Sequence, residues 1–164
     1  MTSRELFDRA IKVVLEHEGE TFTDDPRDQG GPTKFGISQR WNPDVNVREL
    51  SRGQAIEIYW ERYWRGRRYE LLPNEIGIKV FDLAVNLGHK TAVTCLQRAL
   101  HACGMNVAID GRLGPQTGGA AKLANQEALM AALRSEAAGE YRLRVARKAD
   151  QVAFKDGWLN RAYA

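Results

Sequence analysis

Residues 75–87 are the part of the chain that most restricts its fold. Their sequence, EIGIKVFDLAVNL, has helical periodicity but is apolar on three sides of the helix. A helix that is apolar nearly all round is stable in water only when other elements cover it. The segment therefore predicts a buried central helix, with the rest of the chain packed around it.

Further helices are predicted before and after this segment. Two capping boxes, in which Thr2 precedes Glu5 and Ser51 precedes Gln54 by three residues, predict helix starts. Residues 92–103 have helical periodicity, and Asn125 is placed to cap a long final helix that reaches to about residue 154. We expect residues 157–161 to form a tail.

The helical period is lost in residues 20–47. This stretch holds Gly30-Gly31, three prolines and short β-like pieces near residues 21–23 and 33–37. The fold class predicted is thus mainly α, a helical bundle around a buried central helix, with a small β-hairpin lobe between the first two helices.

The chain has 164 residues, which predicts one compact unit that needs no disulfide or metal to fold. Cys95 and Cys103 lie eight apart in one helical pattern, too far for a disulfide, so we expect both to be reduced. The charged N-terminus lacks the apolar core of a signal peptide, and no apolar run is long enough to span a membrane. We expect synthesis in a cytoplasm, no stable membrane insertion and a monomeric chain.

Charge is distributed unevenly along the chain. Residues 1–82 hold 13 Lys and Arg against 15 Asp and Glu, whereas residues 83–164 hold 11 against 6. A basic half is typical of proteins that meet an anionic polymer, such as nucleic acid, a membrane surface or an acidic cell wall. A merely well-solvated surface explains the same numbers.

Glu18 is the strongest candidate for chemistry. It follows Val14 by four residues and Ile11 by seven, so it continues the apolar stripe of the first helix into its last turn. Apolar neighbours and the helix macrodipole both disfavour an anion there. A carboxyl that keeps its proton is what a general acid requires. The alternative is a helix-ending glutamate in solvent.

Two other clusters have competing interpretations. Asp24, Asp25 and Asp28 suggest calcium, but their spacing is not that of an EF-hand, and a tight loop held by side-chain-to-backbone bonds is favoured. The run at residues 62–69, RYWRGRRY, interleaves basic and aromatic side chains. Such a run could bind sugar rings and anionic wall polymer, or it could bind nucleic acid. Alternatively, it is a helix end whose aromatic rings are buried and whose arginines extend to solvent. No nucleic-acid motif accompanies it, and we expect no nucleic-acid partner.

The chain resembles a known family in an ordered series of motifs. Glu18-Gly19, Asp25-Pro26, Asp28 and GGPTKFGIS at residues 30–38, followed by Ile58-Tyr59 and Tyr63-Trp64, are similar to glycoside hydrolase family 108. These are lysozyme-like N-acetylmuramidases, many of them phage endolysins. Later pieces resemble the predicted peptidoglycan-binding region usually fused to that family; they include Phe81-Asp82, Asn86, Gly88, QRAL at 97–100, Asp110-Gly111, GPQT at 114–117 and GWLNR at 157–161.

The resemblance implies a catalytic lysozyme-like region over residues 1–75 and a peptidoglycan-binding region over 76–164. Because the apolar segment 75–87 falls at their junction and no linker separates them, we expect the two regions to pack as one unit. It implies Glu18 as general acid, with Asp28 and Thr33 acting on water or on charge at the anomeric carbon. The family usually has a second glycine where this chain has Glu20, so Glu20 is a rival second carboxylate. The implied substrate contacts are Phe35, Tyr63, Trp64 and Asn86, and no cofactor or metal is expected.

The expected activity is cleavage of the β-1,4 bond between N-acetylmuramic acid and N-acetylglucosamine in peptidoglycan glycan strands. A bacteriolytic phage or prophage lysin of this kind acts on the wall after release by a membrane-pore (holin) partner or after export. Two alternatives are a lytic transglycosylase, which needs no second acid, and a non-catalytic wall-binding or secretion-associated module.

Overall fold

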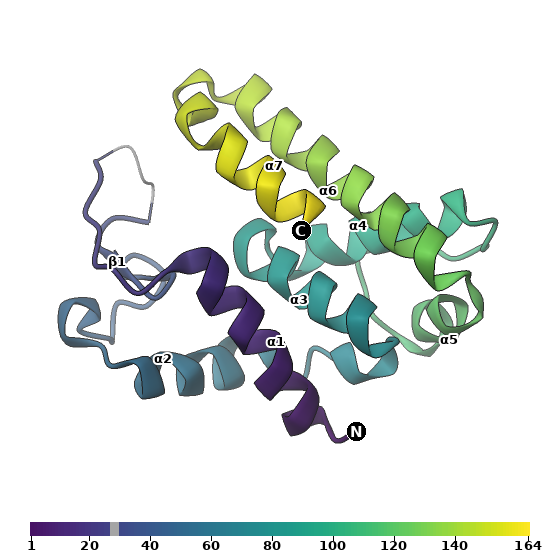
Figure 1. Cartoon of the computed structure of the whole chain (residues 1–164), viewed down its shortest axis with the longest axis horizontal. Coiled ribbons are helices and arrows are strands. Elements are labelled where there is room, and N and C mark those ends of the chain that lie inside the picture. Colours follow the sequence, from purple (N-terminus) through teal and green to yellow (C-terminus); the bar gives the residue numbers. More distant parts are fainter. Residues whose placement is uncertain (27–29) are drawn as a thin grey trace.

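The structure, a computed structural model, describes residues 1–26 and 30–164 (Figure 1). Its first half contains α1 (Ser3–Glu18), β1 (Thr33–Lys34), β2 (Ile37–Ser38), α2 (Arg52–Ile58) and a π-helical segment, Tyr59–Trp64. Its second half contains α3 (Asn74–Leu87), α4 (His89–Ala102), α5 (Pro115–Leu123), α6 (Gln126–Arg147) and α7 (Lys155–Tyr163). Short 3-10 turns lie at Val47–Glu49, Tyr69–Leu71 and Ala149–Phe154.

The segment expected at the centre is α3. It packs against α1 and α4, with smaller contacts to α6, and ten of its residues are buried. The two strands pair antiparallel, with Thr33 opposite Ser38, and Thr23 bridges to Thr33. The predicted fold class, mainly α with a small hairpin lobe, is confirmed. No helix in the described parts of the chain is long and apolar enough to cross a membrane.

Helix α1 forms as its sequence predicts. Thr2 and Glu5 make the reciprocal bonds of the capping box, and the apolar stripe from Leu6 to Leu15 is buried. The helix ends at Glu18, and the Gly19 N–H closes the last turn on the Leu15 carbonyl at 3.0 Å. Glu18 is therefore held at the end of a helix whose other turns are anchored in the core.

The helix that starts at the capping box of Ser51 does not stay regular to its end. The chain widens into a π-helix after Ile58, and the Arg65 N–H bonds to the Trp60 carbonyl five residues back. The wider turn brings Trp64 onto the same face as Tyr59, in the core. Trp64 is only 1% exposed and packs on Phe7 and Phe81.

The C-terminal end also differs from the expectation. The long helix stops at Arg147, and the residues expected as a tail form α7, which packs along α6. The turn returns Trp158 to stack on Tyr141, with ring centroids 5.6 Å apart. It also buries Arg161 and Ala162, and the C-terminus lies beside the middle of the molecule (Figure 1). Both cysteines are free, as predicted.

The hydrophobic core gives a prediction for the domain organisation. Buried side chains of α1, α3, α4 and α6 form one continuous cluster, so we propose that the two regions fold as one unit. Thermal unfolding followed by circular dichroism and by fluorescence should give one coincident transition. A chain cut near residue 75 should be insoluble, because the cut separates α3 from α1. If residues 76–164 fold alone and bind purified sacculi as tightly as the full chain, this proposal is wrong.

Candidate active site at the end of helix α1

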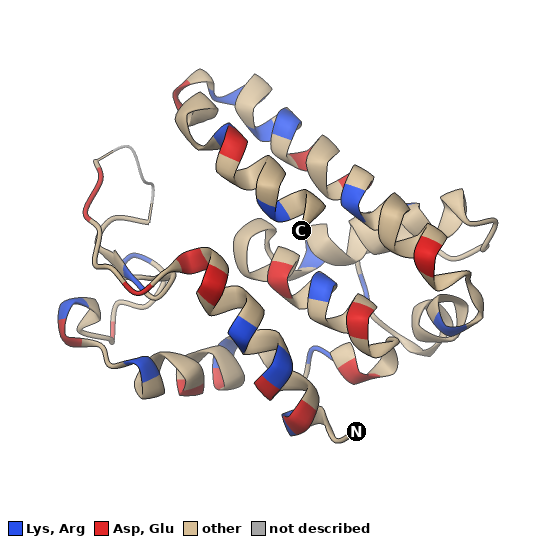
Figure 2. Cartoon of the chain, viewed as in Figure 1, with Lys and Arg blue, Asp and Glu red and all other residues tan. Residues whose placement is uncertain are grey.

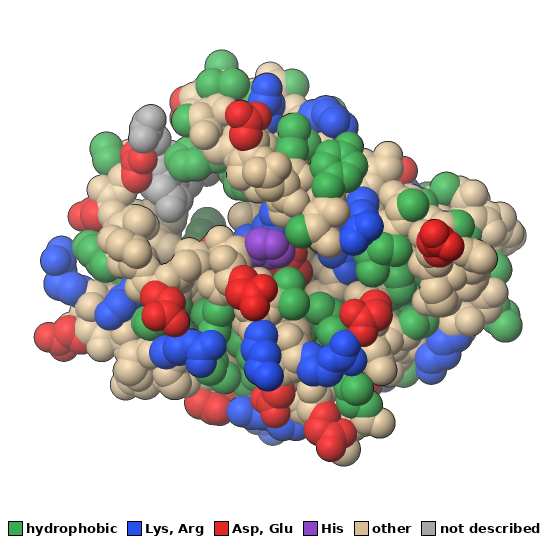
Figure 3. All heavy atoms as spheres, viewed as in Figure 1, with side chains coloured by type: hydrophobic (Ala, Val, Ile, Leu, Met, Phe, Trp, Pro, Cys, Tyr) green, Lys and Arg blue, Asp and Glu red, His purple; other side chains and the backbone are tan. Residues whose placement is uncertain are grey.

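A cleft of about 780 Å³ lies between the hairpin lobe and the far end of the α6–α7 pair. Figure 3 shows the hollow between these two parts. The first half of the chain contributes Glu18, Thr33, Gly36, Ser38 and Trp41. The second half contributes Asn86, Arg144, Arg147, Lys148, Phe154 and Trp158. Both halves therefore build the same cleft.

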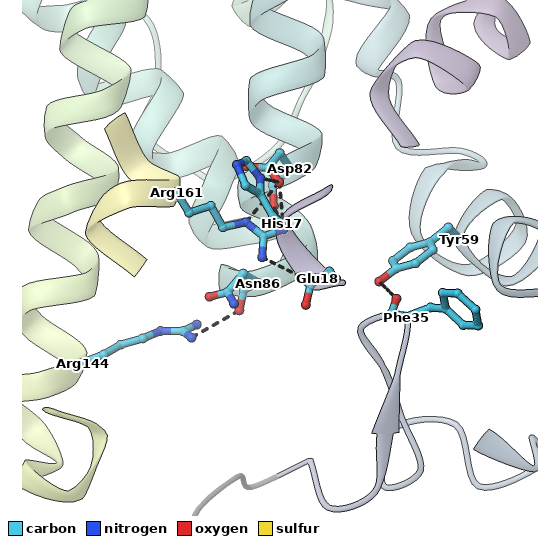
Figure 4. A network of polar contacts seen from close by, with 8 residues as sticks. All are labelled: His17, Glu18, Phe35, Tyr59, Asp82, Asn86, Arg144 and Arg161. Carbon is cyan, nitrogen blue, oxygen red and sulfur yellow. Dashed lines mark hydrogen bonds and ion pairs between the residues drawn. The ribbon is translucent and has the colours of Figure 1, made fainter. Parts of the chain in front are cut away.

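The Glu18 carboxylate is paired with an arginine from the last helix. The Arg161 guanidinium donates to Glu18 Oε1 at 2.5 Å, and the two side chains are 7% and 19% exposed. In Figure 4 the other carboxyl oxygen points away from Arg161, toward the open side near Asn86. One oxygen is thus fixed by an ion pair, and the other is presented to the cleft.

Arg161 is itself held by a buried acid on α3. Its Nη2 lies 2.8 Å from Asp82 Oδ1, and His17 Nδ1 lies 3.0 Å from the same oxygen. Burial alone would raise the pKa of Asp82, but the hydrogen bond to His17 and the Arg161 charge lower it below its ordinary value. Burial works against the Arg161 charge, yet Glu18 and Asp82 outweigh it and raise the pKa of Arg161. Both shifts favour the charged forms of Asp82 and Arg161.

A second buried cation fixes the helix that supplies Arg161. The Lys79 ammonium on α3 donates to the Arg161 backbone carbonyl at 2.6 Å. Burial lowers the pKa of Lys79 to about 8. The main chain and the side chain of Arg161 are therefore both anchored to α3, which leaves the guanidinium little freedom to leave Glu18.

The hairpin touches Glu18 from the opposite side, at Gly36. A Cβ at this residue would lie 2.6 Å from Glu18 Cγ and 2.5 Å from the Tyr59 hydroxyl oxygen. That hydroxyl donates to the Phe35 carbonyl at 2.9 Å and so holds the turn in place. Only glycine permits the hairpin to approach the carboxyl this closely, at a φ of 75°.

Gly36→Ala should therefore displace the Glu18 and Tyr59 side chains, in addition to straining the backbone. Overpacking of this kind costs about 1–3 kcal/mol, and we expect a lower melting temperature together with reduced activity. Gly31→Ala is the matched control, because Gly31 has a similar φ of 66° but no described atom within 4 Å of its Cβ. Equal losses in the two variants would show that strain alone is responsible.

Three of the residues expected at the site line the cleft, namely Glu18, Thr33 and Asn86. The Thr33 hydroxyl donates to the Gly31 carbonyl at 2.8 Å. Asn86 lies beside Arg144, which bonds to its backbone carbonyl at 3.2 Å. Asp28 lies outside the described residues.

Three expected substrate contacts are not among the cleft residues. The rings of Phe35 and Trp64 are buried in the core, because Phe35 turns inward at a positive φ and the π-helix rotates Trp64. Tyr63 is half-buried against Tyr59, with ring centroids 5.2 Å apart. The rival acid Glu20 points to Arg52 at 3.3 Å and does not line the cleft.

Sequence reasoning assigned no role to Arg161, Asp82 or His17. A signal was present in residues 75–87, where Lys79 and Asp82 are charged side chains in a segment expected to be buried. Buried charges need partners, so each pointed to an opposite charge elsewhere in the chain. Nothing in the sequence identified Arg161 as that partner.

Basic residues follow the charge pattern of the sequence. Arg144, Arg147 and Lys148 of the basic half line the cleft, and Figure 2 shows Lys and Arg along the same stretch of α6. The run at residues 62–69 is different. Its Trp64 and Tyr69 are buried, and Arg62 and Arg65 pair with Asp44 and Glu61. The structure favours the interpretation of that run as a helix end.

Comparisons with known proteins agree with this architecture. Residues 11–88 match the family model described as glycosyl hydrolase 108, and residues 91–163 match that of a predicted peptidoglycan domain. The solved structure of Brucella abortus SagA is similar, with a TM-score of 0.75 and 27% sequence identity over 97% of this chain and 90% of that chain. No curated protein matches the sequence.

Fold, site and matches together define a lysozyme-like glycoside hydrolase that acts on peptidoglycan. Within that class, residues 11–88 match the glycosyl hydrolase 108 family, and residues 91–163 match the predicted peptidoglycan domain. The two matches meet at the junction of α3 and α4. Glu18 and Asp82 thus belong to the hydrolase region, while Arg161 belongs to the peptidoglycan domain.

Proposed function

We propose that the protein is a muramidase, which hydrolyses the β-1,4 bond between N-acetylmuramic acid and N-acetylglucosamine. The observation that carries the proposal is the position of the Glu18 carboxyl. It stands in a cleft built by both matched regions, with one oxygen fixed by Arg161 and the other facing the cleft. A long polymer can lie in such a cleft with one of its bonds beside the carboxyl.

Glu18 would act as the general acid. In its protonated form it donates to the glycosidic oxygen as the bond to the anomeric carbon breaks. The carboxylate that remains is stabilised by the Arg161 guanidinium, whose Nη1 already lies 2.5 Å from Glu18 Oε1. Charge that forms on Glu18 during the reaction therefore meets a fixed, buried partner and needs no rearrangement of the protein.

The attacking water would be held by the hairpin. Thr33 lines the cleft, and its hydroxyl oxygen can accept a hydrogen bond from water while the hydroxyl donates to the Gly31 carbonyl. We propose that Asp28, which lies between Glu18 and Thr33 in the same family motif, acts with Thr33. Glu20 is less suited, because its carboxylate is turned to Arg52.

Analysis of the products of purified sacculi tests this assignment. After digestion and borohydride reduction, a muramidase leaves reduced muramic acid at the new chain ends. Reduced glucosamine would show cleavage of the other glycosidic bond, and 1,6-anhydromuramic acid would show a lytic transglycosylase. A module that binds the wall without catalysis would release no fragments.

A further inference from the structure

Trp41 is the most exposed tryptophan of the described chain, and it lies in the cleft. The side chain lines the same cavity as Glu18 and is 68% exposed, whereas Trp64 is 1% exposed. A tryptophan buries a large apolar area when it can, and exposed aromatic side chains are enriched where a ligand covers them. The proposed catalytic steps give this ring no role.

The turn that carries Trp41 is firmly built. The next residue, Asn42, is 1% exposed, and its amide donates to the Ser38 carbonyl at 3.1 Å. Gln39 donates to the Val45 carbonyl at 2.6 Å, and Arg62 donates to Asn42 Oδ1 at 2.8 Å. The ring is therefore exposed because the surrounding hydrogen bonds hold it outward, and not because its loop lacks contacts.

One face of the ring is already supported. The Arg40 guanidinium lies over it, 5.3 Å from the ring centroid, a distance typical of a cation–π contact. Support from one side restricts the ring, and most of its surface stays exposed. A flat apolar surface held in one orientation beside a polar cleft is complementary to the C–H face of a sugar ring.

We propose that Trp41 is a stacking platform for an N-acetylhexosamine ring of the glycan strand, at a subsite along the cleft from Glu18. The proposal rests on the proposed function, since the stacked sugar belongs to the strand that Glu18 would cleave. Phe154 and Trp158 also line the cleft, but Trp158 is half-buried and already stacks on Phe154 and Tyr141, with ring centroids 5.8 and 5.6 Å apart. Arg147 and Lys148, which line the cleft beside them, attract anions but have no aromatic face. We therefore expect the platform to bind the sugar rings of the glycan strand and not the peptides attached to it.

Tryptophan fluorescence provides a direct test with glycan strands freed of peptides by an amidase. The Glu18→Gln variant serves as the binding form, so that the strands are not cut. Bound glycan should shield Trp41 from acrylamide quenching. Trp41→Ala should remove this protected signal and weaken glycan binding by about tenfold, the loss of roughly one well-packed contact. Trp41→Tyr, which keeps an aromatic face, should retain most of the affinity.

Leu123→Ala is the control, because Leu123 is 80% exposed and lies outside the cleft; its binding should be unchanged. Equal glycan affinity of Trp41→Ala and its parent overturns the platform, as does a quenching profile that glycan leaves unaltered. If the wild type cleaves sacculi while Trp41 proves irrelevant, only this inference fails. If Trp41 is protected by glycan while the wild type releases no products, only the proposed hydrolysis fails.

Discussion

Glu18→Gln is expected to abolish hydrolysis of the cell wall while the protein stays folded. The amide is nearly isosteric with the carboxyl and can still accept the hydrogen bond from Arg161, so the core of the site should persist. It cannot donate the proton that the leaving oxygen needs, and general acid catalysis supplies about 10²–10⁴-fold in rate. Clearing of a suspension of purified walls, followed by turbidity, measures the loss.

Glu20→Gln is the matched control for this variant. It makes the same chemical change two residues away, on a side chain that is 67% exposed and paired with Arg52, and it should leave the activity near that of the wild type. Both variants should bind sacculi. Glu18→Gln activity above about a tenth of the wild-type value would contradict the acid role. A larger loss in Glu20→Gln than in Glu18→Gln would show that Glu20 is the essential carboxylate.

Arg161→Lys is expected to cause the second-largest loss. Arg161 contacts Glu18 and Asp82 at once through different nitrogens of one rigid guanidinium, and an ammonium group cannot reproduce that geometry. The charge remains, which avoids the roughly 3–5 kcal/mol cost of leaving buried acids unpaired. Glu18 should then be misplaced, and we expect kcat on soluble glycan strands to fall by about 10²-fold with little change in KM.

Arg134→Lys provides the comparison for Arg161→Lys. Arg134 also holds α7, through a bond of 2.7 Å to the Ala164 carbonyl, but it does not touch Glu18. Its variant should keep the wild-type kcat even if its melting temperature falls. Equal kcat values for the two variants would mean that Arg161 serves only to attach α7.

Much of the helical frame could be predicted because its signals are local. The capping boxes at Thr2 and Ser51 need only four consecutive residues, and both form as the sequence indicates. The burial of α3 follows from its own apolar surface. The position of Glu18 at the end of α1 also follows from a single helical stripe and its terminal glycine.

The rest depends on tertiary contacts that no short segment specifies. Arg161 lies 143 residues from Glu18 in the sequence, and its approach needs the turn after α6, which a helical pattern does not indicate. Similarly, the π-helix places Trp64 in the core through packing on Phe7 and Phe81. The local pattern therefore placed Glu18 at the end of a buried helical stripe, whereas the arginine that holds its carboxylate became visible only in the fold.

Digestion of purified sacculi in water labelled with heavy oxygen tests the central claim most directly. If Glu18 directs hydrolysis in this cleft, the wild type should release fragments whose new muramic acid ends each carry one heavy oxygen, and Glu18→Gln should release none. Unlabelled 1,6-anhydromuramic acid ends would contradict the account, because the bond would then be broken without water. Label at glucosamine ends would contradict the proposed bond specificity.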